Sequence, residues 1–337
     1  MNMAEFWRLS FPVPGQSELL AQSAEQQGWD GLFFPDTQCL SGDIYSAMCL
    51  AAKATQHLKV GTAVTNPVTR HPSVTASAIA TVQVESNGRA VLGIGRGDSS
   101  LAYIGRKPAP VSTLERYLDQ LQRYLRGEPV DIDGYASQNM WIQTSGQPKV
   151  PVDVAATGPR VISLGATMAE QVTFALGANA PRIKSAMELA KTARAASGLN
   201  PDDLSFGAYV NIACDDDRQR AQAMIRGSVG TFAHFTGMSD ANSEGLPDAE
   251  IYRHIGANYD MANHARNVAG HMQSVPDAFI SRFAVTGNAS YCVDRLGELI
   301  AFGLDRLVLL TGSRDANSDH IAASLERLAS DVFPQLR

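Results

Sequence analysis

Short apolar runs alternate with longer amphipathic segments along almost the whole 337-residue chain, and this alternation most constrains the fold. Each strand-like run is followed by a segment with helical periodicity. The eight strand candidates are 6–11, 31–35, 59–65, 90–94, 152–156, 171–176, 204–213 and 306–310. Eight strand–helix units are the number that a closed parallel barrel requires. The sequence therefore predicts an α/β fold, a (β/α)8 TIM barrel, as a single domain over residues 1–337.

Two segments interrupt the alternation. Residues 127–151 are rich in turn residues and are predicted to form an insertion, such as a hairpin, after the fourth strand. A long polar and helical segment, roughly 216–273, is predicted as a second insertion, after the seventh strand. A doubly wound open sheet is the alternative architecture, but its Gly-x-Gly-x-x-Gly fingerprint does not follow the first strand.

Composition excludes several classes of function. The formal net charge of -6 gives no basic surface for nucleic acid or for an anionic membrane. The four cysteines form no Cys-x-x-Cys pair, and the histidines have no metal-ligand spacing, so no metal is expected. The N-terminal segment lacks the basic and long apolar regions of a secretory signal, and no later run is long enough to span a bilayer. We therefore expect a cytoplasmic protein.

Polar residues follow the second and third strand candidates. Asp36 comes directly after residues 31–35, where a carboxylate could accept hydrogen bonds from ring N–H groups, shuttle a proton, or cap the following turn. Thr65 and Asn66 end the third strand. His71 precedes Pro72 at the start of the next helix, and a structural cap is favoured there over a catalyst.

Alternate glycines mark the end of the fourth strand. Gly93, Gly95 and Gly97 remove side chains where the backbone passes close to something flat or bulky, although a tight loop would explain them as well. Arg96 adds a charge and Asp98 a carboxylic acid at the same place. The spaced Gly-Lys-Ser/Thr ending of a Walker loop is absent.

The fifth strand candidate runs directly into a helix through Ala156, Thr157, Gly158, Pro159 and Arg160. Free N–H groups at a helix N-terminus, a glycine and an arginine suit a phosphate, and an ordinary strand–helix junction is the alternative. Because the carboxyl ends of barrel strands share one rim, the four strand ends together predict a pocket for a ring and its phosphate.

Three segments resemble a known family. VTNPVTRHPSVTASAIATVQVESNGRAVLGIGRGDSSLAYIG (64–105), AATGPRVISLGATMAEQ (155–171) and FAVTGNASYCVDRLGELIAFGLDRLVLL (283–310) resemble the bacterial-luciferase-like superfamily. The first segment is most similar to the coenzyme F420-dependent methylenetetrahydromethanopterin reductases. The resemblance covers nearly the whole chain and implies a barrel oxidoreductase that uses a flavin or deazaflavin.

The resemblance also implies site residues. Members that bind deazaflavin have a non-prolyl cis peptide bond against the ring, and the matching bond is Ala63–Val64. Residues expected at the polar edge of the ring are Asp36, Thr37, Thr65 and Asn66. Gly95, Arg96, Gly97 and Asp98 would pass beside the ring and tail, and Asp98 matches an acidic position that donates a proton. The tail and phosphate would contact Ala156, Thr157, Gly158, Pro159, Arg160, Ala175 and Gly177.

Three positions depart from the family's pattern. Relatives that oxidise alcohols or sugar phosphates have a histidine after the aspartate of the second strand, where this chain has Thr37. Ser10 stands where an acidic residue is common, and the usual Ala-Asp-Gly before the sixth strand is Ala169-Glu170-Gln171. The missing histidine disfavours alcohol oxidation.

The leading hypothesis is an F420-dependent oxidoreductase that transfers a hydride between reduced deazaflavin and a small organic substrate, pterin-like or unsaturated. Asp98 and Asp36 are its candidate catalytic residues, with Asp98 supplying or relaying the proton. The alternative is a two-component monooxygenase that uses reduced FMN and O2 on an apolar substrate. A non-catalytic flavin-binding protein is a third possibility, disfavoured because the polar strand ends are retained.

Two further expectations rest on the family. Members commonly form homodimers through helices near the second and third strands, where small residues would permit close packing, although a position facing the core would explain them as well: Ser73, Ala76, Ala78 and Ala80. The segment 227–273 is expected to form a substrate-side lid. Its aromatic and histidine residues are Phe232, His234, Phe235, His254, Tyr259 and His264. Most of its histidines are interpreted as solvated helix residues rather than substrate contacts.

Overall fold

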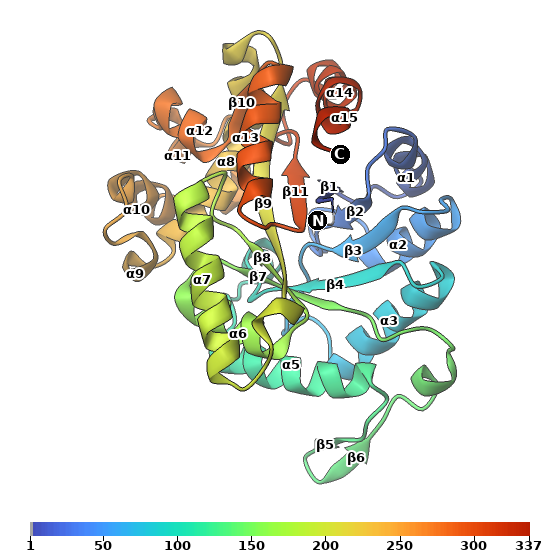
Figure 1. Cartoon of the computed structure of the whole chain (residues 1–337). Helices are drawn as coiled ribbons and strands as arrows, with labels where there is room; N and C mark the ends of the chain where they lie inside the picture. The colour runs from blue at the N-terminus through green and yellow to red at the C-terminus, as the bar shows by residue number, and fades with distance from the viewer. Residues whose placement is uncertain (1–2) are drawn as a thin grey trace. The chain divides into compact units, whose positions relative to one another are not determined.

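The computed structural model describes residues 3–337 (Figure 1). The chain divides into two compact units. The amino-terminal unit comprises residues 9–155 and 164–172, and the carboxy-terminal unit comprises the described residues up to Arg8, residues 156–163 and residues 173–337. The single domain expected over residues 1–337 stays a prediction.

The parallel strands belong to one sheet that closes on itself, so the fold is the predicted (β/α)8 barrel and not an open sheet. The strands of this sheet are β1 (Glu5–Leu9), β2 (Gly31–Phe34), β3 (Lys59–Thr62), β4 (Ala90–Ile94), β7 (Val152–Ala156), β8 (Gln171–Phe174), β9 (Ser205–Cys214), β10 (Val285–Gly287) and β11 (Arg306–Leu310). The strand β10 was not predicted.

In the amino-terminal unit, β2, β3, β4 and β7 pair in parallel in that order. Every residue of β2 and β4 is buried, as expected for strands covered on both faces. Gly61 of β3 lies opposite Phe33 and Val91. A Cβ at Gly61 would approach the Phe33 ring to 2.3 Å, so the glycine makes room for this core ring.

The helices of this unit are α1 (Ser17–Gln26), α2 (Ile44–Lys53), α3 (Pro72–Glu85), α4 (Ser99–Ala102) and α5 (Val111–Leu125). Helix α1 packs on α2, and α3 packs on both α2 and α5. Strands β5 (Val130–Ile132) and β6 (Tyr135–Ser137) form an antiparallel hairpin within residues 127–151, as the turn residues there predict. Figure 1 shows this hairpin beyond α5, away from the parallel strands.

In the carboxy-terminal unit, β9 pairs with β11 along one edge and with β8 and β10 along the other, and β11 also pairs with β1. The helices are α7 (Ala180–Ala196), α8 (Arg218–Gly237), α9 (Asp240–Ser243), α10 (Ala249–Ala257), α11 (Gly270–Gln273), α12 (Asp277–Phe283), α13 (Ala289–Ala301), α14 (Ser318–Arg327) and α15 (Phe333–Leu336), while α6 (Pro159–Met168) spans residues of both units.

The C-terminal helix departs from its expected form. One helix is predicted over 317–332, but α14 ends at Arg327 and a π-helical turn, Leu328–Val332, leads into α15. Phe333 of α15 stacks on Phe6 of β1 with ring centroids 4.4 Å apart, and both rings are fully or almost fully buried. The wider turn therefore precedes a residue that anchors the end of the chain in the core.

Among the helices of residues 3–337, none combines the length and the apolar character that crossing a bilayer requires.

Candidate active site

Most of the predicted ring-binding residues lie in the amino-terminal unit. Because β2, β3 and β4 are adjacent and parallel, their carboxyl ends lie on the same side of the sheet. The polar residues just beyond β2 and β3 are almost fully buried: Asp36, Thr37, Thr65 and Asn66. Buried polar groups need partners, and these partners show how the strand ends are held together.

Asp36 forms an ion pair with Arg70, which lies in the loop between β3 and α3. The Thr65 hydroxyl also donates to the same carboxylate oxygen, Asp36 Oδ2, at 2.7 Å. The Arg70 guanidinium lies 5.0 Å from the centre of the Tyr45 ring. Burial alone would lower the pKa of Arg70, but the charge and hydrogen bond of Asp36, together with Tyr45 and Asp43, outweigh it, and the pKa lies above its ordinary value.

The carboxylate of Asp36 is therefore anchored on its Oδ2 side by a cation and a hydroxyl. Its predicted role in catalysis stays a prediction, and any proton transfer by Asp36 must compete with this ion pair. Arg70 is a residue that the sequence prediction of the site omitted. The two partners are 34 residues apart, a distance in sequence at which spacing gives no sign of contact.

Asn66 and the short helix α4 join the loops that follow the strands. Asn66 Oδ1 accepts hydrogen bonds from the backbone N–H groups of Val68 and Thr69, and its Nδ2 donates to Ser100 Oγ at 3.2 Å. The Thr37 hydroxyl lies 3.3 Å from the Ser99 hydroxyl. The loops after β2 and β3 are thus both fastened to α4, which the sequence pattern did not predict.

The Ala63–Val64 peptide bond is cis, as the resemblance implies. Both residues are half-buried, whereas their neighbours Thr62 and Thr65 are fully buried. A Cβ at Gly93 would lie 2.0 Å from the Thr62 carbonyl oxygen, and a Cβ at Gly95 would lie 3.1 Å from Val64 Cγ2. Gly93 in β4 and Gly95 just after it therefore allow this close approach, and no side chain at position 95 covers Val64.

Gly97, Arg96 and Asp98 shape the turn that follows β4. Gly97 has a φ of +82°, and a Cβ there would come within 2.7 Å of Leu101. Arg96 Nε donates to the Ala109 carbonyl at 2.5 Å, and Ala109 N–H donates back to the Arg96 carbonyl at 2.9 Å. Asp98 is half-buried and begins α4. Arg96 thus closes the loop over residues 96–109, and its place beside a ring stays a prediction.

The residues predicted to hold the tail lie in the carboxy-terminal unit. Thr157 and Gly158 are half-buried, while Pro159 and Arg160 are exposed at the start of α6. The Gly158 carbonyl accepts from the N–H groups of Val161 and Ile162, which starts the helix. The carboxamide of Asn242 in α9 lies so close that a Cβ at Gly158 would be 2.5 Å from its oxygen. Asn242 is a second residue that the sequence prediction omitted.

The other predicted tail residues are buried. Ala156, Ala175 and Gly177 are covered by protein, and Ala175 N–H donates to the Ala156 carbonyl at 2.9 Å. Gly177 has a φ of +71°, and a Cβ there would lie 2.7 Å from the Phe283 carbonyl oxygen. Contacts within the protein therefore account for the glycine at this position.

Three histidines of the expected lid segment, 227–273, are buried. The interpretation of most of its histidines as solvated helix residues is therefore wrong. His234, His264 and His271 are at most 9% exposed and surround Tyr259, whereas His254 is exposed. The Tyr259 hydroxyl lies 2.8 Å from His264 Nδ1, and the Tyr259 ring stacks on His234 with centroids 3.9 Å apart. Burial lowers the pKa of His271, and the neighbouring His234 lowers it further.

Two residues singled out in the sequence have structural contacts. His71 is exposed, and its Nδ1 accepts the Ser73 N–H at 3.3 Å, so it caps α3 as predicted. Glu170, in the departure from the family pattern before β8, accepts the Val152 N–H at 2.9 Å and pairs with Lys149 at 3.0 Å. Among residues 3–337, no His, Cys, Asp and Glu side chains are grouped as a metal site would be.

Comparison with known proteins agrees with the barrel fold. Residues 13–306 match the family described as luciferase-like monooxygenase. A 5,10-methylenetetrahydromethanopterin reductase from Methanolobus tindarius is 27% identical over 304 residues, covering 86% of this chain and 87% of the relative. An F420-dependent glucose-6-phosphate dehydrogenase from Beutenbergia cavernae is 27% identical and covers 95% of this chain and 93% of that protein.

The solved structures include the coenzyme F420 dependent tetrahydromethanopterin reductase from Methanopyrus kandleri, which superposes with a TM-score of 0.75. It is 21% identical and covers 99% of this chain and 100% of that one, a likeness that shows the fold. The chain is a barrel enzyme of the oxidoreductase class. It belongs to the luciferase-like monooxygenase family.

Proposed function

We propose that this enzyme is a coenzyme F420-dependent oxidoreductase that transfers a hydride between the reduced deazaflavin and a small organic substrate, pterin-like or unsaturated. The observation that carries the proposal is the group of residues at the ends of β2, β3 and β4, all within one unit. The relatives named above, which use F420 or reduce a methanopterin derivative, support the choice of cofactor and substrate class.

The residues present fit a flat ring. Ala63 and Val64 offer a half-buried apolar surface. Position 95, just after β4, is a glycine, so no side chain covers this surface from there. Buried polar groups, Thr65 and Asn66, follow directly on β3. An apolar face bordered by a few polar groups is the usual lining of a cofactor site.

A bound F420 would supply the carbon that carries the hydride, and the protein would supply orientation, exclusion of water and proton transfer. Val64 would support one face of the ring. Asp98, held at the start of α4 by N–H groups of Leu101 and Ala102 that donate to its carbonyl, would give its carboxyl proton to the reduced substrate. Thr37, bonded to Ser99, offers no base for abstracting an alcohol proton, so reduction is the favoured direction.

The carboxy-terminal unit contains a candidate phosphate site of its own. The start of α6, with half-buried Thr157 and Gly158 and exposed Arg160, offers N–H groups and a positive charge for a phosphate. Asn242 adds an amide beside Gly158. Arg160→Gln should therefore weaken binding of the complete cofactor more than binding of a deazaflavin that lacks the phosphate.

The test is a fluorescence titration of the purified apoprotein with F420 and, separately, with FMN. We expect F420 to bind at least about tenfold more tightly, a difference of about 1.4 kcal/mol. The matched variant is Gly95→Val, whose side chain would cover Val64 and should abolish ring binding. Tight FMN binding without measurable F420 affinity would overturn the proposal.

The alternative is a two-component monooxygenase that uses reduced FMN and O2 on an apolar substrate, and the family's description favours it. It predicts tight binding of FMN and oxygen consumption when reduced FMN and a substrate are supplied together. The F420 proposal predicts neither.

We also propose that the protein forms a homodimer. Of the four small residues expected at the interface, Ala76 and Ala80 are buried in the chain's own core, so only Ser73 and Ala78 are accessible on α3. Val74, on the same helix, is 53% exposed. Sedimentation of the wild type and of Val74→Lys tests the proposal: a dimer that dissociates in the variant supports it, and a monomeric wild type contradicts it.

A further inference from the structure

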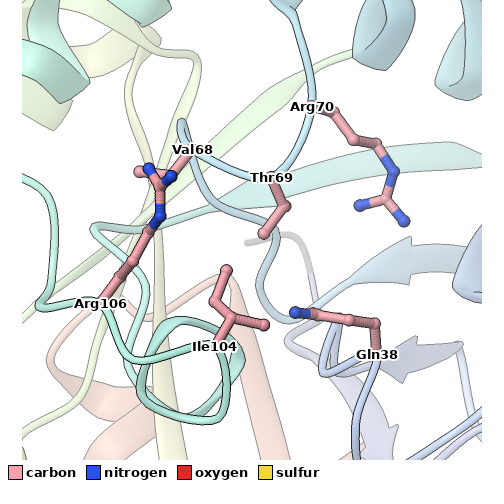
Figure 2. A pocket seen from close by; sticks show the side chains of 6 residues that line it. All are labelled: Gln38, Val68, Thr69, Arg70, Ile104 and Arg106. Carbon is pink, nitrogen blue, oxygen red and sulfur yellow. The ribbon is translucent and has the colours of Figure 1, made fainter.

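A pocket of about 390 Å³ opens beside the strand ends of the amino-terminal unit (Figure 2). Three segments build it: the loop after β2, the loop between β3 and α3, and the turn after α4. The lining residues are Gln38, Val68, Thr69, Arg70, Ile104 and Arg106. Figure 2 shows Ile104 and Gln38 pointing into the space between these segments. We call it the Arg106 pocket.

The walls of the Arg106 pocket are fixed by hydrogen bonds. Gln38 Nε2 donates to the Ser100 carbonyl at 2.9 Å, which ties the first segment to α4. Asn66 Oδ1 receives the Val68 and Thr69 N–H groups at 3.0 Å each and so fixes the second segment. The Arg106 N–H donates to the Leu101 carbonyl at 2.9 Å, which fixes the third. A pocket with fixed walls does not have to order its loops when a ligand binds.

The lining is positively charged, and none of its six residues is acidic. Arg70 is paired with Asp36 and lies 3.4 Å from Asp43, so its charge is already balanced. Arg106 is exposed and forms no ion pair within residues 3–337, and Lys107 next to it is exposed as well. The free charge of the pocket therefore resides on the Arg106 guanidinium.

The other lining groups of the pocket suit an organic anion rather than an inorganic one. Ile104 is 44% exposed, and with Val68 it presents an apolar surface to the pocket. A guanidinium binds a carboxylate through two parallel N–H groups, and the second N–H of the Gln38 amide is close to the same space. We propose that the Arg106 pocket binds the carboxylate group of a small organic acid, with Arg106 as its counter-ion.

Two molecules could bring this carboxylate. One is the cofactor, because F420 carries glutamyl carboxylates beyond its phosphate, and this source rests on the proposed function. The other is the substrate itself, which would then belong to the carboxylic acids. The chemistry of recognition is the same, and the experiment separates the two.

The experiment compares the wild type with Arg106→Gln, with Arg106→Lys and with the control Arg116→Gln, which removes an exposed arginine of α5. Each protein is titrated with succinate by calorimetry, and with F420 and a deazaflavin lacking phosphate and glutamates by fluorescence. Because Arg106 is exposed, its replacement should leave folding intact, which circular dichroism checks.

We expect Arg106→Gln to lose about tenfold in succinate affinity, Arg106→Lys to lose less, and Arg116→Gln to behave as the wild type. A parallel loss for F420, but not for the shortened deazaflavin, identifies the cofactor as the source. A loss of affinity for succinate alone identifies an acidic substrate as the source. This outcome supports the proposal even if the protein binds no deazaflavin. Equal affinity of all four proteins for succinate and for F420 overturns the proposal.

Discussion

The ion pair between Arg70 and Asp36 can be tested by removing the cation. Arg70→Met keeps most of the apolar stem but leaves the Asp36 carboxylate, whose side chain is 3% exposed, without its counter-ion. Unit charges in contact at about 3 Å attract by about 5 kcal/mol at an effective dielectric constant of 20. Arg70 is 20% exposed and recovers some hydration in the unfolded chain. We therefore expect a loss of about 3 kcal/mol in the free energy of unfolding.

The double variant Asp36→Asn/Arg70→Met separates the ion pair from the rest. An asparagine at position 36 keeps an acceptor for the Thr65 hydroxyl and carries no charge. Adding Asp36→Asn to Arg70→Met should therefore recover part of the free energy of unfolding that Arg70→Met loses. We expect a coupling free energy of about 2 kcal/mol between the two positions.

Thermal unfolding followed by circular dichroism measures the effect. With an unfolding entropy of about 2.1 cal/mol/K per residue, a loss of about 3 kcal/mol lowers Tm by about 4 °C if the whole chain unfolds together. If Arg70→Met and the double variant both melt within 1 °C (about 0.7 kcal/mol) of the wild type, the ion pair does not hold the strand ends together and the reasoning is refuted.

Three further predictions concern other parts of the molecule. Gly93→Ala should destabilise the protein by about 3 kcal/mol or prevent folding, because its Cβ would lie 2.0 Å from the Thr62 carbonyl oxygen, and urea unfolding measures this. Asp98→Asn should lower kcat by about 100-fold while the Kd for F420 changes little; an equal loss in both would make Asp98 a structural residue. The hydrogen bond from Arg220 lowers the pKa of Asp215, so this carboxylate stabilises the fold above the ordinary aspartate pKa and the contribution is lost as pH falls through the lowered one. Arg220→Gln should therefore lower Tm at pH 7, and its difference from the wild type should shrink as the pH falls from about 4 through the lowered pKa; a constant difference across this range would contradict the assignment.

Much of the fold was predictable because barrel strands and helices have clear local signals. The bounds of β4, β7 and β11 agree with the prediction from the sequence. Each of these strands is a compact apolar run between turn residues, and α3 begins at Pro72. The strand β10 has only three residues and directly follows α12, so it offers too short a run for a period to be recognised.

The sequence predicted where the candidate site lies, but it predicted only some of the contacts within the site. The sequence points to the strand ends because polar residues follow apolar runs there, and Asp36, Thr65 and Asn66 are indeed buried at those ends. The partners Arg70 and Asn242 were missed, because contacts across long stretches of chain are set by tertiary structure.

Most histidines of the expected lid segment were also predicted incorrectly, because they are buried and not solvated. A histidine in a polar helical segment gives no local sign that it will be buried, and three of them pack around Tyr259 in the folded chain. Their burial depends on how α8, α11 and the segment between these helices pack together, and the periodicity of a single sequence does not encode that.

The hydrogen bonds of α4 have a consequence for the rate of ligand capture. Ser99 and Ser100 link the loops after β2 and β3 before any ligand arrives, so little conformational entropy should be lost there on association. The N–H groups of Leu101, Ala102 and Tyr103 donate to carbonyls of this turn, so their hydrogen exchange should already be slow in the free protein and change little on saturation. The association rate constant would then be limited by diffusion and by the orientation of the ligand, and not by the ordering of these loops.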